Sequence, residues 1–237
     1  MRPLPPASLS RRWQRSRATG GDCVLGYPAA MPVTSTSAPL LTSRFQQAFA
    51  LASQVHATQL RKGTAIPYLA HVMSVAALVL EAGGTKDTAI AALLHDAVED
   101  SADGAAMESR IRGQFGRHVA GIVLACSDTV AVPGQPKPRW RQRKQTYLNH
   151  LRAETDPGVF LVSACDKLHN ARSIVADLRT IGPAVWDRFS ESDPAAQLWY
   201  YQSLADTYAG HIPPPLLGEL ERVIGEMRSL ATGAPDI

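Results

Sequence analysis

The side chains best suited to chemistry lie close together in residues 95–100, whose sequence HDAVED directly follows an apolar stretch. Charged groups beside a hydrophobic core cost free energy unless they are paired or bound to a metal. If these residues continue a helix, positions three and four apart share a face. We therefore expect the four ionisable groups to crowd one end of a helix.

Two interpretations of this cluster compete. A solvated final helical turn with ordinary acids would account for a single Glu-Asp pair, but it accounts less well for His-Asp and Glu-Asp together. We therefore interpret His95 and Asp96 as adjacent metal ligands, an imidazole nitrogen and a carboxylate oxygen. Glu99 and Asp100 would then handle protons and water.

A metal site of this kind needs a further histidine and a further carboxylate. His71 stands just after Pro67-Tyr68, in the first turn of a predicted helix, and Asp166 follows the apolar run of a later helix. Each residue alone has an ordinary explanation, a structural histidine or a helix-capping aspartate. Their occurrence together with the HDAVED cluster favours a metal site.

Several short words of sequence accompany these residues in a fixed order. The order H…HD…D resembles that of the HD phosphohydrolase superfamily. The words resemble those of the hydrolase domain of the RelA/SpoT group and of its small stand-alone relatives, the alarmone hydrolases. The similarity runs from about residue 45 to about residue 178. The words are RKG at 61–63, PYLAH at 67–71, HDAVED at 95–100, FG at 115–116 and DKLHN at 166–170.

The resemblance implies a divalent metal, usually Mn²⁺ in this group. Its ligands would be His71, His95, Asp96 and Asp166. Imidazole and carboxylate ligands also suit Fe²⁺, Zn²⁺, Co²⁺ and Ni²⁺, because affinity discriminates poorly among these ions. The metal would lower the pKa of a bound water and neutralise a phosphate oxygen.

The same resemblance implies roles for five further residues. Glu99 and Asp100 match the positions that orient or deprotonate the water and assist the leaving group. Asn170 lies one helical turn beyond the fourth ligand and would address the nucleotide. Arg61 and Lys62 match a basic pair near the guanine and the phosphates. Solvated surface side chains are the competing interpretation for Asn170 and for the basic pair.

A basic segment follows a proline-rich stretch. We expect Lys137 and Arg141 from this segment to bind substrate, because clustered positive charge attracts a polyphosphate. A solvated basic helix face is the alternative for each residue. The stretch is longer and richer in proline than in close alarmone hydrolases. The segment comprises Lys137, Arg139, Arg141, Arg143 and Lys144.

Two further histidines are interpreted as structural. His56 lies on the first predicted helix and is expected to pack or to form a hydrogen bond. His169 is adjacent to Asn170, but neighbouring positions on a helix point about 100° apart, so we place it away from the metal. Val72, where the family commonly has proline, affects the start of a helix rather than a ligand.

The resemblance implies hydrolysis of the 3′-pyrophosphate of ppGpp or pppGpp, which yields GDP or GTP and pyrophosphate. Two alternatives keep the same site. One is an HD phosphohydrolase that acts on another nucleotide, a phosphomonoester or a reduced-cofactor phosphate. The other is a nucleotide-binding HD module without catalysis, against which the intact ligands and acidic residues argue.

The elements that must position these residues are helices. Apolar residues recur with helical spacing, and no stretch alternates with the period of a strand. We expect an all-α HD-domain helical bundle, with a loop at 133–138 where three prolines occur. The predicted helices are 42–55, 68–81, 85–100, 105–114, 116–127, 140–152, 157–178, 183–189, 194–208 and 215–230.

The predicted domain organisation is simple. Residues 1–41 are rich in Ser, Thr and Pro and are expected to form a disordered leader, or to precede a true start at Met31. An Arg-Arg pair there resembles part of a twin-arginine signal, but no apolar stretch follows it. A single HD hydrolase domain is expected over 42–231, with core motifs at 45–178 and C-terminal helices at 182–231.

Composition limits the class of protein and of partner. The chain has 237 residues, with 24 basic and 21 acidic side chains, and this mild imbalance does not by itself indicate nucleic acid. Three widely spaced cysteines favour no disulfide framework, so we expect a cytoplasmic protein. No apolar run approaches the roughly 20 residues of a membrane span. We expect a small nucleotide as the partner, with homo-oligomerisation left open.

Overall fold

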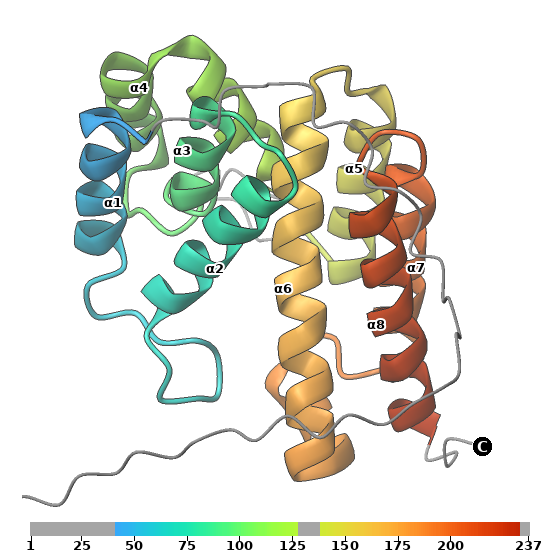
Figure 1. Ribbon diagram of the computed structural model, residues 1–237. Helices are drawn as coiled ribbons and strands as arrows, with labels where there is room; N and C mark the ends of the chain where they lie inside the picture. Colours follow the sequence, from blue (N-terminus) through green and yellow to red (C-terminus); the bar gives the residue numbers. More distant parts are fainter. Residues whose placement is uncertain (1–40, 128–137, 233–237) are drawn as a thin grey trace, which may run out of the picture. The chain divides into compact units, whose positions relative to one another are not determined.

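The computed structural model describes residues 41–127 and 138–232, which form helices joined by turns (Figure 1). These residues contain no strand, and Leu60 and Pro67 form an isolated β-bridge. The predicted all-α fold is confirmed. The elements are α1 (Ser43–Val55), α2 (Tyr68–Glu81), α3 (Lys86–Leu94), α4 (Gly104–Cys126), α5 (Trp140–Ala153), α6 (Pro157–Ile181), η1 (Gly182–Arg188), α7 (Pro194–Tyr208) and α8 (Pro214–Thr232).

Short polar side chains begin several helices. The Asp103 carboxylate accepts a hydrogen bond from the Ala106 amide at 2.9 Å at the start of α4. Asp156 accepts one from the Gly158 amide at 2.8 Å at the start of α6. Thr42 stands at the N-cap of α1 as predicted, but its side chain makes no capping bond. Side-chain acceptors thus satisfy amide groups that have no partner inside the helix.

The third helix is shorter than predicted. We expected it to end near Asp100, but α3 ends at Leu94. The Ala97 amide bonds to the Leu94 carbonyl, three residues back, which tightens the chain into a turn. The ionisable residues at 95–100 therefore lie in a turn segment and not along one face of a helix.

The two helices predicted at 105–114 and 116–127 are the two halves of α4. Gly116 separates them with φ 88° and ψ 169°, a conformation outside the helical region. Glycine adopts a positive φ without a steric penalty, which explains the kink at this residue.

Helix α6 runs through the middle of the domain, with α1–α4 on one side and α5, α7 and α8 on the other (Figure 1). It packs against α2, α3, α4, α7 and α8. Its buried side chains include Phe160 and Leu168, which belong to one continuous hydrophobic core. A polar residue in the middle of α6 is therefore held rigidly between the two groups of helices.

The C-terminal part agrees closely with the prediction. Helices α7 and α8 begin at prolines, whose fixed φ suits a first helical turn. The segment predicted as a helix at 183–189 is the 3₁₀ helix η1, with Trp186 buried beneath it. The predicted leader up to residue 40 and the proline-rich residues 133–137 lie outside the described residues.

The turn between α2 and α3 provides a stability test. A Cβ atom at Gly84 would lie 2.5 Å from Cγ1 and 2.7 Å from the carbonyl oxygen of Val79. Gly84→Ala is expected to lower the free energy of unfolding by about 1–3 kcal/mol through overpacking. Gly121→Ala in α4, where a Cβ meets open space, should instead leave stability unchanged or raise it slightly. Urea unfolding of both variants checks this, and equal stabilities would contradict the packing argument.

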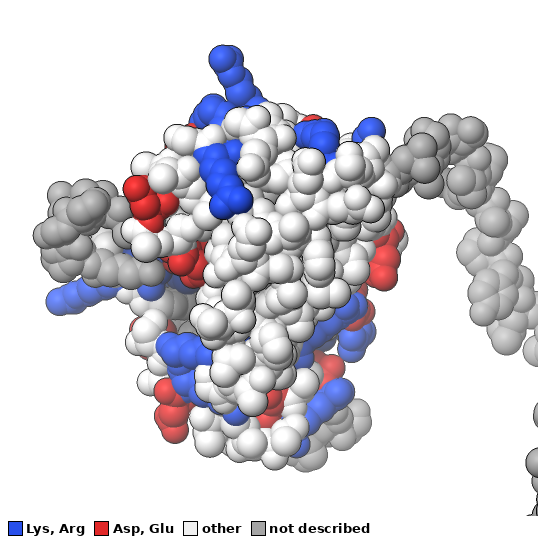
Figure 2. All heavy atoms as spheres, turned by 90° about the vertical axis from the view of Figure 1, so that its left-hand side faces the viewer, with Lys and Arg blue, Asp and Glu red and all other residues white. Residues whose placement is uncertain are grey.

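No helix within the described ranges is both long and apolar enough for a bilayer crossing. Figure 2 shows the face of the molecule on the α1 side, where Lys and Arg alternate with Asp and Glu around an uncharged middle. The basic side chains do not form a continuous surface on that face.

Candidate functional site

Four side chains from three parts of the chain converge beside the middle of α6. His71 comes from the first turn of α2, Asp166 from α6, and His95 and Asp96 from the turn after α3. Nε2 of His71 lies 3.1 Å from Oδ1 of Asp166, and Nε2 of His95 lies 2.9 Å from Oδ2 of Asp96. One ligand atom from each of His71, His95 and Asp96 falls within a 4.8 Å group. The structure thus brings the four predicted ligands together.

The chemistry of these donors fits a divalent cation. Nε2 of His95 is buried and has no hydrogen-bond partner among the described residues. Nδ1 of the same ring lies 2.8 Å from the Ala92 carbonyl oxygen, which only accepts, so Nδ1 donates. Nε2 is therefore the nitrogen that can face a cation, with oxygens of Asp96 and Asp166 at 2.9 and 3.7 Å. Neutral imidazole and carboxylate groups are ligands for first-row divalent metals.

Neighbouring side chains hold the two carboxylates in place. The Tyr68 hydroxyl donates to Oδ2 of Asp96 at 2.5 Å. Asn170 donates through its side-chain amide to Oδ1 of Asp166 at 2.6 Å, and the Lys167 ammonium lies 2.5 Å from the other oxygen of Asp166. Such outer contacts orient metal ligands and limit their rotation. The site is therefore preorganised by residues of α2 and α6.

Charge interactions inside the cluster shift the pKa values of its members. Burial by itself lowers the pKa of His95, but the Asp96 and Asp166 carboxylates together outweigh it and raise that pKa well above its ordinary value. Burial raises the pKa of Asp96, yet His95 holds it well below the usual range. For Asp166, Lys167 and the two imidazoles overcome burial and also keep the pKa well below the usual range. Both carboxylates are thus ionised at neutral pH.

A fifth side chain, His169, contacts the site in a way that sequence spacing does not reveal. Its Nδ1 lies 2.8 Å from Nδ1 of His71, on the side of that ring away from the carboxylates. Burial and the neighbouring His71 lower the pKa of His169 to about 4. His169 is therefore a neutral partner of one predicted ligand and lies outside the predicted ligand set.

The two acidic residues after Asp96 occupy the turn that follows α3. Asp100 is exposed and accepts a hydrogen bond from the Gln59 side-chain amide at 2.9 Å. The side-chain oxygen of Gln59, Oε1, in turn accepts from Nδ1 of His56 at 2.6 Å. Glu99 is half-buried beside Asp100. His56 thus has the structural hydrogen bond that we expected, and the chain His56–Gln59–Asp100 orients one of the two acids.

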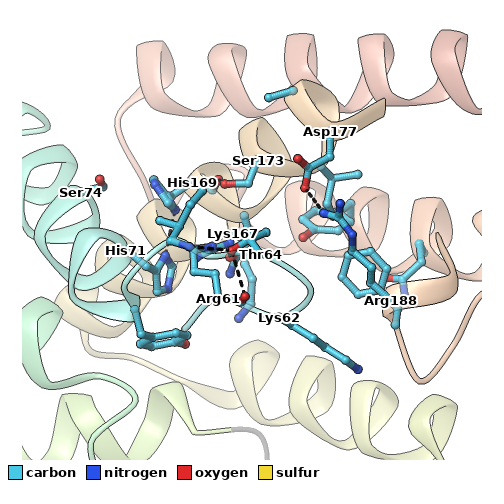
Figure 3. A pocket seen from close by; sticks show the side chains of 18 of the residues that line it. Arg61, Lys62, Thr64, His71, Ser74, Lys167, His169, Ser173, Asp177 and Arg188 are labelled. Atoms are coloured by element: carbon cyan, nitrogen blue, oxygen red, sulfur yellow. Dashed lines mark hydrogen bonds and ion pairs between the residues drawn. The ribbon is translucent and has the colours of Figure 1, made fainter. Parts of the chain in front are cut away.

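A cavity of about 500 Å³ opens beside His71. Arg61, Lys62 and Lys167 contribute positive charge to its wall near that histidine (Figure 3). Arg188, paired with Asp177 at 2.7 Å, lies farther along the wall in the same view. A drug-sized or nucleotide-sized ligand occupies a cavity of this volume. Glu99 and Asp100 are not among the residues that line it.

The sequence profile of the HD domain matches residues 48–190, a range that contains the four converging side chains and most of the cavity wall. The chain belongs to the HD domain family.

Relatives of this HD domain include hydrolases of guanosine nucleotides. The guanosine-3′,5′-bis(diphosphate) 3′-pyrophosphohydrolase of Xenopus tropicalis is 34% identical over 138 residues, 57% of this chain and 69% of the relative. The protein of the same name from Aquifex aeolicus is 32% identical over 136 residues, 57% of this chain. This chain spans only 18% of that longer relative.

The fold of the HD domain is also shared with a solved structure. A metazoan ortholog of SpoT, described as hydrolysing ppGpp, has a TM-score of 0.62 and 24% sequence identity with this chain. The similarity covers 80% of this chain and 97% of the solved chain. At this identity the comparison establishes the shared fold.

Some of the residues predicted to bind substrate line the cavity, and others lie away from it. A guanidinium nitrogen of Arg61 donates to the Asn170 side-chain oxygen at 2.8 Å. These two predicted substrate-binding residues therefore lie together in the cavity wall. Arg141 lies instead over the Trp199 ring, 3.2 Å from its centroid, and does not line the cavity. Lys144, one helical turn further, does line it. Lys137 lies outside the described residues.

The raised pKa of His95 predicts that metal binding releases a proton. The carboxylates that raise the pKa of His95 favour a proton on Nε2 in the absence of metal, and a metal bound by Nε2 would have to displace that proton. We expect about one proton released per metal at neutral pH, and weaker binding as the pH falls. The pKa of His71 is lowered by burial, so His71 should contribute no further proton.

Calorimetric titration with Mn²⁺ in two buffers of different ionisation enthalpy measures this release. The apparent heat should differ between buffers for the wild-type protein and for His118→Gln, a half-exposed histidine of α4. A heat that does not depend on the buffer would contradict the assigned protonation of His95.

Proposed function

We propose that the chain hydrolyses the 3′-pyrophosphate of ppGpp or pppGpp. The observation that carries the proposal is that His71, one of the four clustered side chains, lines a cavity whose wall also contains several cationic side chains. A guanosine tetraphosphate presents many negative charges next to one scissile bond, which matches this arrangement of charge. Relatives that bear the name of such a hydrolase at 32% and 34% identity support the same assignment.

The reaction breaks the bond between the ribose 3′ oxygen and the adjacent phosphorus. The water oxygen bonds to that phosphorus, the 3′ oxygen takes up a proton, and pyrophosphate leaves with the hydroxyl from water. Glu99 and Asp100 accept the proton of the water and return a proton to the 3′ oxygen. A divalent cation, for which we propose Mn²⁺, supplies the lowered water pKa and neutralises phosphate charge when bound by His71, His95, Asp96 and Asp166.

The cavity wall provides the means of binding the nucleotide. Arg61 is fixed by its hydrogen bond to Asn170, which in turn bonds to Asp166, so a contact with the nucleotide is mechanically linked to the metal ligand. Lys62 and Lys144 offer point charges for phosphate groups. A planar guanidinium such as that of Arg61 can also stack on a base. Arg61 and Asn170 therefore orient both the nucleotide and the metal ligand Asp166.

We also propose a cytoplasmic setting. Cys126 and Cys165 are free and buried, and they are the cysteines within the described residues. Burial raises the pKa of both thiols above the ordinary value, which keeps them unreactive. Free structural thiols suit a reducing compartment.

The test is a comparison of substrates with purified protein and Mn²⁺. We expect pyrophosphate and GDP from ppGpp, and no product from GTP, NADPH or p-nitrophenyl phosphate. Release of phosphate from NADPH or the phosphomonoester without cleavage of ppGpp would favour a different HD phosphohydrolase. Bound Mn²⁺ without cleavage of any compound would favour a nucleotide-binding module. Addition of EDTA to the active sample is the control for metal dependence.

The basic segment supplies a matched pair of variants. Lys144→Ala is expected to raise the KM for ppGpp about 10–150-fold, because a charge-assisted contact contributes roughly 1.5–3 kcal/mol. Arg141→Ala, three residues away over Trp199, should change KM much less. Initial rates at several ppGpp concentrations distinguish the two. A larger effect at Arg141 would return it to the role predicted from the sequence.

A further inference from the structure

The contact between His71 and His169 joins two helices at the edge of the proposed metal site. Their Nδ1 atoms are 2.8 Å apart, and the ring centroids are 4.8 Å apart with an interplanar angle of 47°. A hydrogen bond at this distance needs one proton between the two nitrogens. One ring must therefore donate and the other must accept.

The other nitrogen of His71 decides which ring donates. Nε2 of His71 faces Oδ1 of Asp166 at 3.1 Å, on the side where the metal would bind. A ligating nitrogen carries no proton, so the proton of a neutral His71 must be on Nδ1. Nδ1 of His169 is then the acceptor, and the proton of the His169 ring is on its Nε2.

We propose that His169 is a positioning residue that selects the metal-binding tautomer of His71. The inference rests on the proposed metal site and adds a residue to it. His95 obtains the same orientation from the backbone carbonyl of Ala92. For His71 the partner is the side chain of His169. A substitution at position 169 can therefore test its effect.

A neutral imidazole acceptor also limits the charge of the site. Asp96 and Asp166 already place two negative charges near the ring of His71. A carboxylate in place of His169 would add a third charge, whereas the imidazole accepts the hydrogen bond without one. Removal of an outer partner of a metal-bound histidine typically weakens metal binding about 10–100-fold.

Two variants separate the hydrogen bond from the packing of the ring. His169→Phe keeps a flat ring but has no acceptor, whereas His169→Gln has an acceptor oxygen but no ring. Binding of Mn²⁺ to the full chain is measured from the loss of the electron paramagnetic resonance signal of free Mn²⁺. We expect affinity about 10–100-fold weaker for the Phe variant and within a few-fold of wild type for the Gln variant. Wild-type affinity in the Phe variant, or equal losses in both, would overturn the proposal.

A measurement on the wild-type protein covers the case in which a variant fails to fold. In protein loaded with diamagnetic Zn²⁺, ¹⁵N spectra of the histidines should show Nδ1 of His71 protonated and Nδ1 of His169 unprotonated. The opposite assignment would overturn the proposal. Neither readout requires hydrolysis, so a protein that binds metal with these tautomers but leaves ppGpp intact would contradict only the proposed function.

Discussion

Asp96→Ala is expected to abolish hydrolysis and to weaken Mn²⁺ binding beyond the roughly 10–100-fold that loss of an outer partner costs. Oδ2 of Asp96 lies 2.9 Å from Nε2 of His95 and 3.8 Å from Nε2 of His71, so the substitution removes the negative charge that lies beside both imidazoles. It also removes the acceptor of the Tyr68 hydroxyl. Calorimetry measures the metal affinity, and pyrophosphate release from ppGpp measures the activity.

Asp96→Asn separates charge from shape. The amide keeps the volume of the side chain and an oxygen that can accept from Tyr68, but it lacks the negative charge. We expect it to fold as the wild type does and to lose metal binding nearly as strongly as the Ala variant. Asp206→Ala removes an exposed carboxylate of α7 and should change neither quantity. Unchanged activity in Asp96→Ala would show that the proposed site is wrong.

The sequence predicts the fold well where local signals are strong. Helix α7 runs from Pro194 to Tyr208 as predicted, because Asp193 caps it and proline favours its first turn. The end of α3 was predicted wrongly, since apolar spacing continues to Val98 while the chain turns after Leu94. The backbone hydrogen bonds of that turn, such as the one from the Ala97 amide to the Leu94 carbonyl, leave no periodic pattern in the sequence.

The candidate site shows the same division. The four predicted ligands could be found in the sequence because each belongs to a short word of the family pattern, and the structure places them close together. The outer partners follow from contacts between helices that are distant in sequence, such as that of His169 on α6 with His71 on α2. Spacing on one helix predicts that His169 lies away from the metal but does not reveal this contact. Arg141 and Lys144 both lie over aromatic rings of α7, but only Lys144 of the two lines the cavity, and spacing along the sequence does not reveal this difference.

The second large effect is expected from Glu99 and Asp100, the two acids that follow the proposed metal ligands His95 and Asp96. Asp100→Asn and Glu99→Gln should each lower kcat for ppGpp by about 10²–10⁴-fold, the usual contribution of a positioned acid or base. Both substitutions keep the shape of the side chain and remove its ability to accept a proton. Because neither residue belongs to the four-ligand cluster, Mn²⁺ affinity should stay near that of wild type. Single-turnover cleavage and a metal titration measure the two quantities.

The hydrogen bonds around Asp100 allow the orientation of this acid to be tested separately from its charge. Gln59 donates to Asp100 and itself accepts from the buried His56, so Gln59→Leu leaves Asp100 charged but without this orientation. We expect that variant to lose kcat by less than Asp100→Asn does. Glu221→Gln, an exposed residue of α8, is the control for a simple change of charge. If Asp100→Asn also lost Mn²⁺, the acid would belong with the ligands, because proton transfer alone does not require it to hold the metal.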